Sequence, residues 1–255
     1  MSRTIAIVGA GPMLGYSVAK AFGAQGYSVA LIARRRDPLE AMREELAGLR
    51  VDAAAFTADV RDPLQLGDAL AQARSRFGSI DVLEYSPLAM AFVPPSQVTG
   101  DIARDAFDFL VAGAIHAVRA VLPDMQARGH GALLFASGRS ALLPMKLLGS
   151  LGLAASAQRH YVYSLHEELR EKGIYVGSVP IFARMDRDAA DGVAALFLEM
   201  IEAGDMVEAV YGVGEAADAA RKIAALTQVH APFELPRPAT SPARICRSTV
   251  AAMKG

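Results

Sequence analysis

The chain has 255 residues, of which 53% are hydrophobic and 21% are charged, and its formal net charge is -1 at pH 7. This composition excludes a disordered chain, and the balanced charge gives no electrostatic basis for binding nucleic acid or an anionic membrane surface. Cys246 is the only cysteine, which excludes an internal disulfide and a cysteine-based metal cluster. The N-terminal apolar run is short and ends in glycines, so we expect a cytoplasmic protein without a membrane span.

Strand-like and helix-like segments alternate along the chain. Aliphatic runs predict strands, and amphipathic patterns predict the helices between them. The expected strands are Thr4–Val8, Ser28–Ala33, Val51–Phe56, Asp81–Tyr85, Ala132–Ala136 and Ile174–Val179. The expected helices are Met13–Gln25, Leu39–Leu49, Pro63–Phe77, Ile102–Arg128 with a bend near Pro123, and Leu151–Lys172. An alanine-rich helical region follows, and the proline-rich stretch from Pro232 to Pro242 is expected as a surface segment or a pocket lid.

This alternation predicts an α/β protein with a three-layer Rossmann fold. A doubly wound parallel sheet of about seven strands is expected between two layers of helices. No internal repeat or linker divides the chain, so residues 1–255 are expected to form one dinucleotide-binding domain. Because ligands of such sheets bind outside the carboxyl ends of the strands, the loops that follow the strands are where function is expected.

A glycine-rich loop, Gly9-Ala10-Gly11-Pro12-Met13-Leu14-Gly15, follows the first expected strand and opens the first helix. Glycines let the backbone turn tightly and approach a pyrophosphate, and the start of the helix presents unpaired N–H groups. An ordinary tight turn is the alternative interpretation. The loop therefore predicts a dinucleotide site formed by Gly9, Gly11, Met13, Leu14 and Gly15.

The second expected strand ends in Arg34-Arg35-Arg36, and no acidic residue occurs between Ser28 and Arg36. A carboxylate here would bind the ribose 2′-hydroxyl of NAD, whereas the planar guanidinium of Arg34 or Arg35 suits a 2′-phosphate. NADP is therefore favoured over NAD, although a solvated basic helix start and a site that binds no cofactor remain alternatives.

The third expected strand is followed by Asp59 and Val60. The Asp59 carboxylate could accept a hydrogen bond from an adenine amino group. A helix cap or a turn aspartate is an equally open interpretation.

Together with Asp81–Leu83, Arg119–Pro123, Gly131–Ser137 and Glu168–Val176, these motifs resemble a short-chain dehydrogenase/reductase over residues 4–180. The resemblance implies a Rossmann fold and an NAD(P) site. It also implies that Ser86 and Pro87, which follow the fourth strand, lie at the nicotinamide end of the cofactor. A homodimer or homotetramer built on the two long helices is expected.

The resemblance also implies a catalytic Asn, a catalytic Ser and a Tyr-x-x-x-Lys pair, in which the Tyr is the acid and base. The matching positions are occupied by Leu110, Gly138, Leu151 and Ala155. None of these side chains can donate, accept or titrate. No Tyr-x-x-x-Lys pair occurs anywhere in the chain. No catalytic residue is identified, and the weak candidates for a substitute are Ser137, Ser140 and Arg159.

Two functions therefore stay open. One is an NADP-dependent oxidoreductase with a non-standard site, which reduces a C=C bond or takes its proton from water or from the substrate. The other is a catalytically degenerate relative used for non-redox chemistry, for ligand sensing or as a silent partner in an oligomer. The four replaced positions favour the second function, in which they are expected to line an enlarged apolar pocket for a small hydrophobic molecule. No spacing of residues indicates a metal site.

Overall fold

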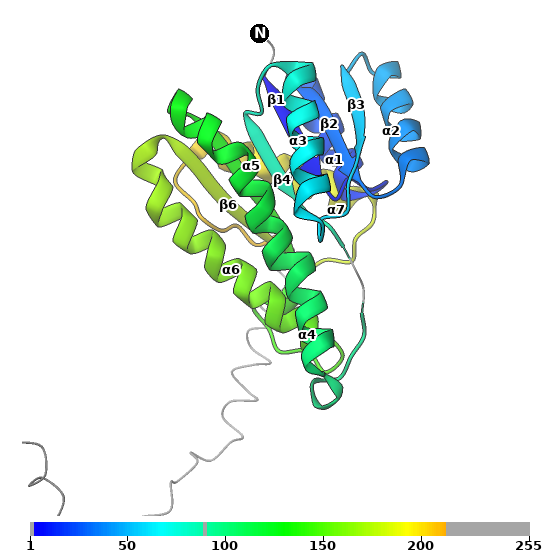
Figure 1. The fold of residues 1–255 in the computed structure, drawn as a ribbon, viewed down its shortest axis with the longest axis vertical. Helices are drawn as coiled ribbons and strands as arrows, with labels where there is room; N and C mark the ends of the chain where they lie inside the picture. Colours follow the sequence, from blue (N-terminus) through cyan, green and yellow to red (C-terminus); the bar gives the residue numbers. More distant parts are fainter. Residues whose placement is uncertain (1–2, 89–90, 213–255) are drawn as a thin grey trace, which may run out of the picture. The chain divides into compact units, whose positions relative to one another are not determined.

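A parallel six-stranded sheet forms the centre of the protein (Figure 1). The computed structural model describes residues 3–88 and 91–212. The strands are β1 (Thr4–Val8), β2 (Ser28–Ala33), β3 (Ala53–Thr57), β4 (Val82–Tyr85), β5 (Gly131–Gly138) and β6 (Ile174–Ile181). Their order is β3-β2-β1-β4-β5-β6, so the direction of winding reverses between β1 and β4. All six strands expected from the sequence are confirmed.

A seventh strand is present only as a short edge in the described part of the chain. Two isolated parallel bridges join Ser178 to Glu208 and Ile181 to Tyr211. The backbone N–H of Ser178 donates to the carbonyl of Val207 at 2.9 Å, and the N–H of Tyr211 donates to Pro180 at 3.1 Å. The sheet therefore has six full strands and a short hydrogen-bonded edge segment that contains Val207, Glu208 and Tyr211, slightly fewer than the expected seven strands.

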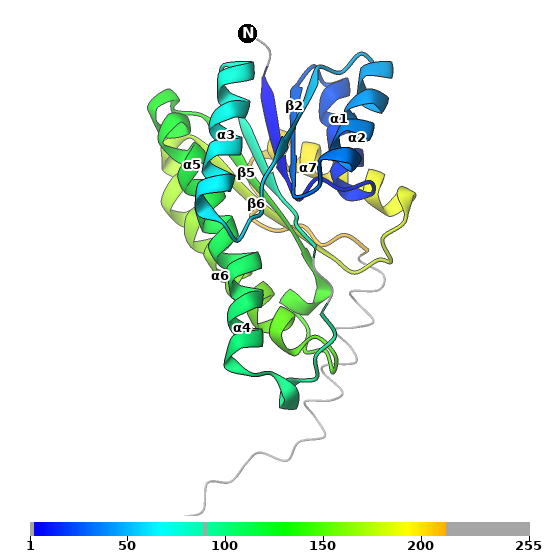
Figure 2. The same ribbon diagram turned by 45° about the vertical axis from the view of Figure 1, so that its right-hand side comes forward.

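Helices cover both faces of the sheet, which confirms the three-layer Rossmann architecture (Figure 2). One layer consists of α1 (Leu14–Ala24), α2 (Arg36–Gly48) and α7 (Arg187–Ala203). The other consists of α3 (Pro63–Phe77), α4 (Gly100–Phe107), α5 (Gly113–Arg128) and α6 (Gly149–Leu169). Each layer buries its own apolar cluster against the sheet. Alternating strand side chains supply both clusters, since successive residues of a strand point to opposite faces.

The long fourth helix differs from its expected form. A π-helical turn, η2 (Asp108–Ala112), separates α4 from α5, whereas α5 continues through Pro123, where a bend was expected. A π turn releases backbone carbonyls from the helical ladder, and they need other donors. Here Tyr85 Oη donates to the carbonyl of Phe109 at 2.6 Å, and Gln158 Nε2 donates to that of Leu110 at 2.8 Å.

The continuous helical stretch Gly100–Arg128 is 29 residues long and is apolar enough to cross a membrane by length and composition. In this fold it lies against the sheet, where Ala114, Val118 and Val121 are buried in the core. The described residues all belong to one compact unit. Cys246 and the stretch Pro232–Pro242 lie outside the described residues, and one domain over residues 1–255 stays a prediction.

Candidate functional site

The glycine loop after β1 is tightly packed against the loop after β4. Gly9 has a φ of +95°, and a Cβ added there would lie 2.4 Å from the backbone nitrogen of Pro87. A Cβ on Gly15 would lie 2.8 Å from the Cα of Ala10. Only glycine fits either position, because a left-handed backbone and a close backbone approach both exclude a side chain. These two glycines bring the start of α1 against the end of β1.

The start of α1 presents free backbone donors. The helix has no side-chain cap and no acidic residue in its first turn. The N–H groups of Gly11, Met13 and Leu14 have no backbone acceptor within the described residues. Unpaired amides at a helix N-terminus, together with the positive end of its dipole, favour an anion. Around Gly11 the nearest atom to an added Cβ is the Gly9 carbonyl at 3.8 Å, so the loop leaves room in front of these amides.

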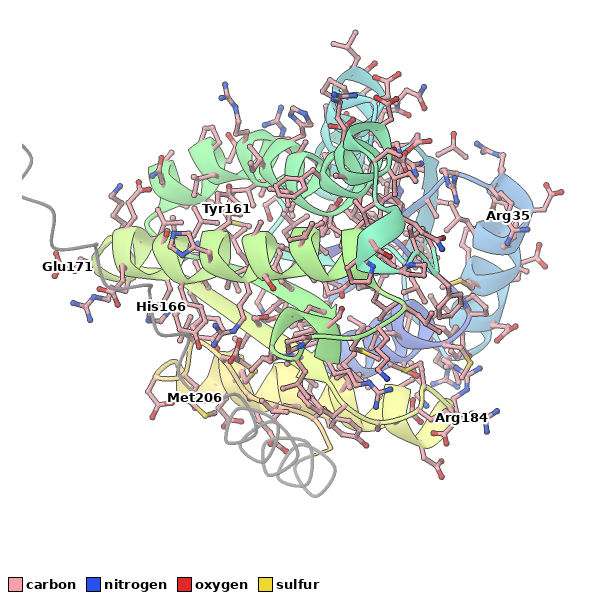
Figure 3. The ribbon with its side chains drawn as sticks, turned by 90° about the horizontal axis from the view of Figure 1, so that it is seen from below. Arg35, Tyr161, His166, Glu171, Arg184 and Met206 are labelled. Atoms are coloured by element: carbon pink, nitrogen blue, oxygen red, sulfur yellow. The ribbon has the colours of Figure 1, made fainter. Side chains whose placement is uncertain are left out.

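Arg34 and Arg35 lie exposed at the carboxyl end of β2. Within the described part of the chain neither guanidinium has a hydrogen bond or an ion pair, whereas Arg36 pairs with Glu40 at 3.4 Å. Figure 3 shows Arg35 beside the start of α2, on the side of the molecule opposite to Glu171. The helix begins at Arg36, three residues before its expected start, because Asp37 and Pro38 suit a first helical turn.

Asp59 and Val60 follow β3 but have different surroundings. The Asp59 carboxylate accepts a 3.0 Å hydrogen bond from the N–H of Arg61, and Asp59 is about one-third exposed. This is the geometry of a turn aspartate, with the second carboxylate oxygen 3.9 Å from an Arg61 guanidinium nitrogen. Val60 is 5% exposed and packs in the core, where its carbonyl faces Gly113.

The sheet order brings the ends of β3, β2, β1 and β4 to one edge. Backbone hydrogen bonds join their loops: Gly9 N–H donates to Ile32 at 2.9 Å, Ala58 N–H to Ala33 at 3.1 Å, and Ser86 N–H to Val8 at 2.9 Å. The glycine loop, the two free arginines, Asp59 and Ser86 therefore surround the carboxyl ends of neighbouring strands. The reversal of strand order between β1 and β4 makes this edge the expected ligand crevice.

The four positions without catalytic side chains lie on neighbouring elements. Leu110 is in the π turn, Gly138 ends β5, and Leu151 and Ala155 are in the first two turns of α6. Leu110 and Leu151 belong to one apolar cluster with Ala106. An apolar cluster therefore surrounds two of the positions where the resemblance implied catalytic side chains, and its residues supply no acid or base.

The three expected substitutes have different surroundings. Arg159 forms a two-pronged ion pair with Glu208, with N–O distances of 2.6 and 2.9 Å, and donates to Tyr163 Oη at 3.0 Å. Arg159 therefore holds α6 against the edge segment beside β6. Ser137 Oγ is buried without a hydrogen-bond partner among the described residues, whereas Ser140 lines a cavity.

A cavity of about 560 Å³ lies beside the start of α6. Its walls come from the η1 region (Pro95–Gln97), the β5–α6 loop and α6 itself. The lining residues are Pro95, Val98, Ser140, Leu142, Leu143, Pro144, Met145, Lys146, Leu148, Gly149, Gly152, Leu153 and Ser156. The expected pocket was to be lined by Leu110, Gly138, Leu151 and Ala155, but none of these four residues lines this cavity, which lies on the adjacent face of α6.

A family model described as short chain dehydrogenase matches residues 3–181. The chain belongs to the short-chain dehydrogenase family. The glycine betaine reductase ATRR of Emericella nidulans is 29% identical over 171 residues, which cover 67% of this chain but only 13% of that longer protein. The sulfoacetaldehyde reductase of Chromohalobacter salexigens is 28% identical over 207 residues, covering 80% of this chain and 77% of the other.

The fold of this short-chain dehydrogenase is similar to solved structures. The apo form of LigD from Sphingobium sp. strain SYK-6 superposes with a TM-score of 0.80, covering 91% of this chain and 98% of LigD at 19% identity. Proteins of the family are oxidoreductases that bind NAD or NADP. Within residues 3–88 and 91–212, no group of three or more His, Cys, Asp or Glu side chains could hold a metal ion.

Three buried polar side chains near the site of this short-chain dehydrogenase were not predicted. Tyr85 and Gln158 hold the π turn, and Glu84 lies fully buried in β4. Burial raises the pKa of Glu84 to about 8, against a smaller lowering by its hydrogen bond from Ser86. The sequence did contain a signal for Glu84, because it is a glutamate inside the strand Asp81–Tyr85, and a buried strand rarely holds a carboxylate.

Proposed function

We propose that this short-chain dehydrogenase binds NADP(H) at the crevice between β1 and β4 and transfers hydride to or from a small hydrophobic substrate. The observation that carries the proposal is the cradle after β1. Free amides of Gly11, Met13 and Leu14 meet there, and Gly9 and Gly15 keep the backbone close. These donors fit an anionic pyrophosphate. The bound nicotinamide would supply the hydride chemistry, and the chain would supply binding and orientation.

The two free arginines support NADP over NAD. Arg34 and Arg35 follow β2, the strand next to β1, and no acidic residue lies between Ser28 and Arg36. A guanidinium binds phosphate oxygens through parallel N–H bonds and stays charged at every relevant pH. A 2′-phosphate would therefore find a cation there, whereas the 2′-hydroxyl of NAD would find no carboxylate.

The proton of the reaction would come from outside the usual positions. Leu110 and Leu151 belong to one apolar cluster, and Ala155 is 4% exposed. A positioned acid contributes about 10²–10⁴-fold to a carbonyl reduction, so its loss favours other substrates. We propose a reaction whose proton is supplied by water or by the substrate, such as reduction of an activated C=C bond.

The cavity beside α6 is proposed as the place of the substrate. It begins at Ser140, two residues beyond the end of β5, and most of its walls are aliphatic. Among the described residues, Lys146 is the only charged one in its lining. A hydrophobic body with one anionic group complements such a cavity, because the body is desolvated and the charge is paired.

The assembly and location are proposals as well. The layer of α5 and α6 would form a homodimer or homotetramer, with Phe107 and Leu153, 39% and 57% exposed, among the side chains to be covered. Light scattering at micromolar concentration tests this. A formal net charge of -1 supports a cytoplasmic protein without a nucleic-acid or membrane partner.

A second candidate is a degenerate relative that senses a ligand, performs non-redox chemistry or serves as a silent partner. The apolar cluster that includes Leu110 and Leu151 favours it, since neither side chain can supply a proton or bind a carbonyl oxygen. NADPH consumption across a panel of ketones, aldehydes, enones and hydrophobic carboxylates separates the two. Turnover supports the oxidoreductase. Binding of NADPH without any turnover supports the second candidate, and the absence of both binding and heat protection overturns the NADPH site.

A further inference from the structure

Glu84 is a carboxyl group inside the sheet. It is the third residue of β4, opposite Ile7 of β1 and Leu134 of β5, and its exposed fraction is 0%. Ile7 and Leu134 belong to the apolar cluster beneath α1 and α7. Glu84 therefore lies in a hydrocarbon layer, where an ionised carboxylate is strongly disfavoured unless it is paired.

No cation in the described part of the chain pairs with this carboxyl group. Ser86 Oγ donates to Glu84 Oε2 at 3.0 Å, and Oε1 has no hydrogen-bond partner within the described residues. The charged groups of the two covering helices are engaged near the surface. Lys20 of α1 pairs with Asp191 of α7 at 2.8 Å, both about 40% exposed.

Arg187 is a further cation of these helices, and the neighbouring strands add no charged group. The Arg187 guanidinium of α7 lies 5.1 Å from the ring centre of Tyr16 of α1. β1 and β5, the strands on either side of Glu84, carry no charged residue. Within the described residues, the Ser86 hydroxyl is the one hydrogen-bond partner of the buried carboxyl group, and burial raises the pKa of Glu84 to about 8.

Ser86 connects this carboxyl group to the dinucleotide crevice. Its N–H donates to Val8 at 2.9 Å, and the next residue, Pro87, is so close to Gly9 that no Cβ fits there. Glu84 is thus connected to Gly9 through its hydrogen bond from Ser86 and the close backbone contact between Pro87 and Gly9. A charge on Glu84 would lie beneath the loop whose free amides face a pyrophosphate.

We propose that Glu84 links a proton to occupancy of the crevice: its neutral form is the one compatible with a bound dinucleotide, and its ionisation weakens binding. This regulation rests on the proposed function of the crevice. The direction follows from charge, because a carboxylate and an anionic pyrophosphate repel each other across a poorly solvated sheet. Binding should therefore take up protons at alkaline pH, as Glu84 returns to its neutral form.

The test is the dissociation constant for NADPH between pH 6.5 and 9.5, measured by fluorescence for the wild type and Glu84→Gln. The variant keeps an acceptor for Ser86 and cannot ionise. We expect wild-type affinity to fall about tenfold between pH 7 and 9.5, which corresponds to a pKa change of about one on binding. The variant should lack this fall. A wild-type profile that is flat, or one that Glu84→Gln reproduces, overturns the linkage and leaves the NADPH site intact.

Calorimetry of the wild type in two buffers of different ionisation enthalpy gives a second measurement that needs no variant. Proton uptake on NADPH binding at pH 8.5 supports the linkage, and zero uptake contradicts it. If the wild type binds no NADPH at any pH, the linkage and the proposed function fail together, which distinguishes that outcome from a failure of Glu84 alone.

Discussion

Gln158 Nε2 donates a 2.8 Å hydrogen bond to the backbone carbonyl of Leu110, across the contact between α6 and the π turn. Gln158 is 2% exposed, so this bond is made in the core. On the other side of the turn, Tyr85 Oη donates to Phe109 at 2.6 Å. The two side chains hold the turn that contains Leu110, the residue expected from the resemblance to stand at the position of the family's asparagine.

Replacing Gln158 by leucine should destabilise the protein. The substitution leaves the carbonyl of Leu110 buried without a donor, which costs about 1–3 kcal/mol. Urea unfolding of Gln158→Leu measures this cost. His160→Ala, an exposed site on the same helix, is the control and should change stability by less than about 0.5 kcal/mol. Equal effects of the two substitutions would contradict the role of this bond.

Removing the charge of Glu208 should destabilise the contact between α6 and the edge segment beside β6. Glu208 is 10% exposed and receives two hydrogen bonds from Arg159, so Glu208→Gln should cost about 1–3 kcal/mol in the free energy of unfolding. The matched control is Glu168→Gln, because its pair with Lys172 is exposed and should contribute less than about 0.5 kcal/mol. A larger loss in the control would show that burial does not decide the strength of these pairs.

Glu84 should make stability fall as pH rises. Burial raises its pKa from 4.5 to about 8, so the folded protein keeps a proton in this window that the unfolded chain has lost. The free energy of unfolding should therefore decrease by roughly 1.4 kcal/mol per pH unit from this group alone. Urea unfolding at pH 5, 6, 7 and 8 should show that the free energy of unfolding of Glu84→Gln increases relative to that of the wild type at each step. A constant difference between them would rule out the raised pKa.

Arg34 should decide the preference for the 2′-phosphate. A hydrogen bond to a charged group contributes about 1.5–3 kcal/mol, so Arg34→Ala should lower the affinity for NADPH by roughly 10- to 100-fold and leave that for NADH nearly unchanged. Arg36→Ala is the control, because Arg36 already pairs with Glu40. Equal losses for both cofactors would mean that Arg34 does not contact the 2′-phosphate.

Much of the fold could be predicted because its determinants are local. Aliphatic runs such as Ser28–Ala33 form buried strands, and the loop Gly9–Gly15 needs glycine where the structure places a left-handed backbone and a close helix contact. Pro63 begins α3 as expected from its missing N–H group. These features depend on a few consecutive residues, so their sequence pattern is sufficient.

The rest depends on contacts between distant residues. The π turn at Asp108–Ala112 is held by Tyr85 and Gln158, which no local pattern connects to it. Arg159 was a candidate for the active site, but its partner Glu208 lies 49 residues away in sequence. The cavity at Ser140 lies beside, and not at, the four replaced positions, because its walls come from η1, the β5–α6 loop and α6, which pack together only in the folded chain.

The most direct test of the account is a fluorescence titration of the wild type, Gly15→Ala and Gly67→Ala with NADPH. A Cβ on Gly15 would meet Ala10 at 2.8 Å, whereas a Cβ on Gly67 in α3 meets no atom within 4 Å, so only the first substitution disturbs the loop. We predict micromolar binding by the wild type and Gly67→Ala, and at least about tenfold weaker binding by Gly15→Ala. Absence of binding by the wild type at millimolar NADPH, or unchanged affinity in a folded Gly15→Ala variant, would contradict a dinucleotide held by this loop.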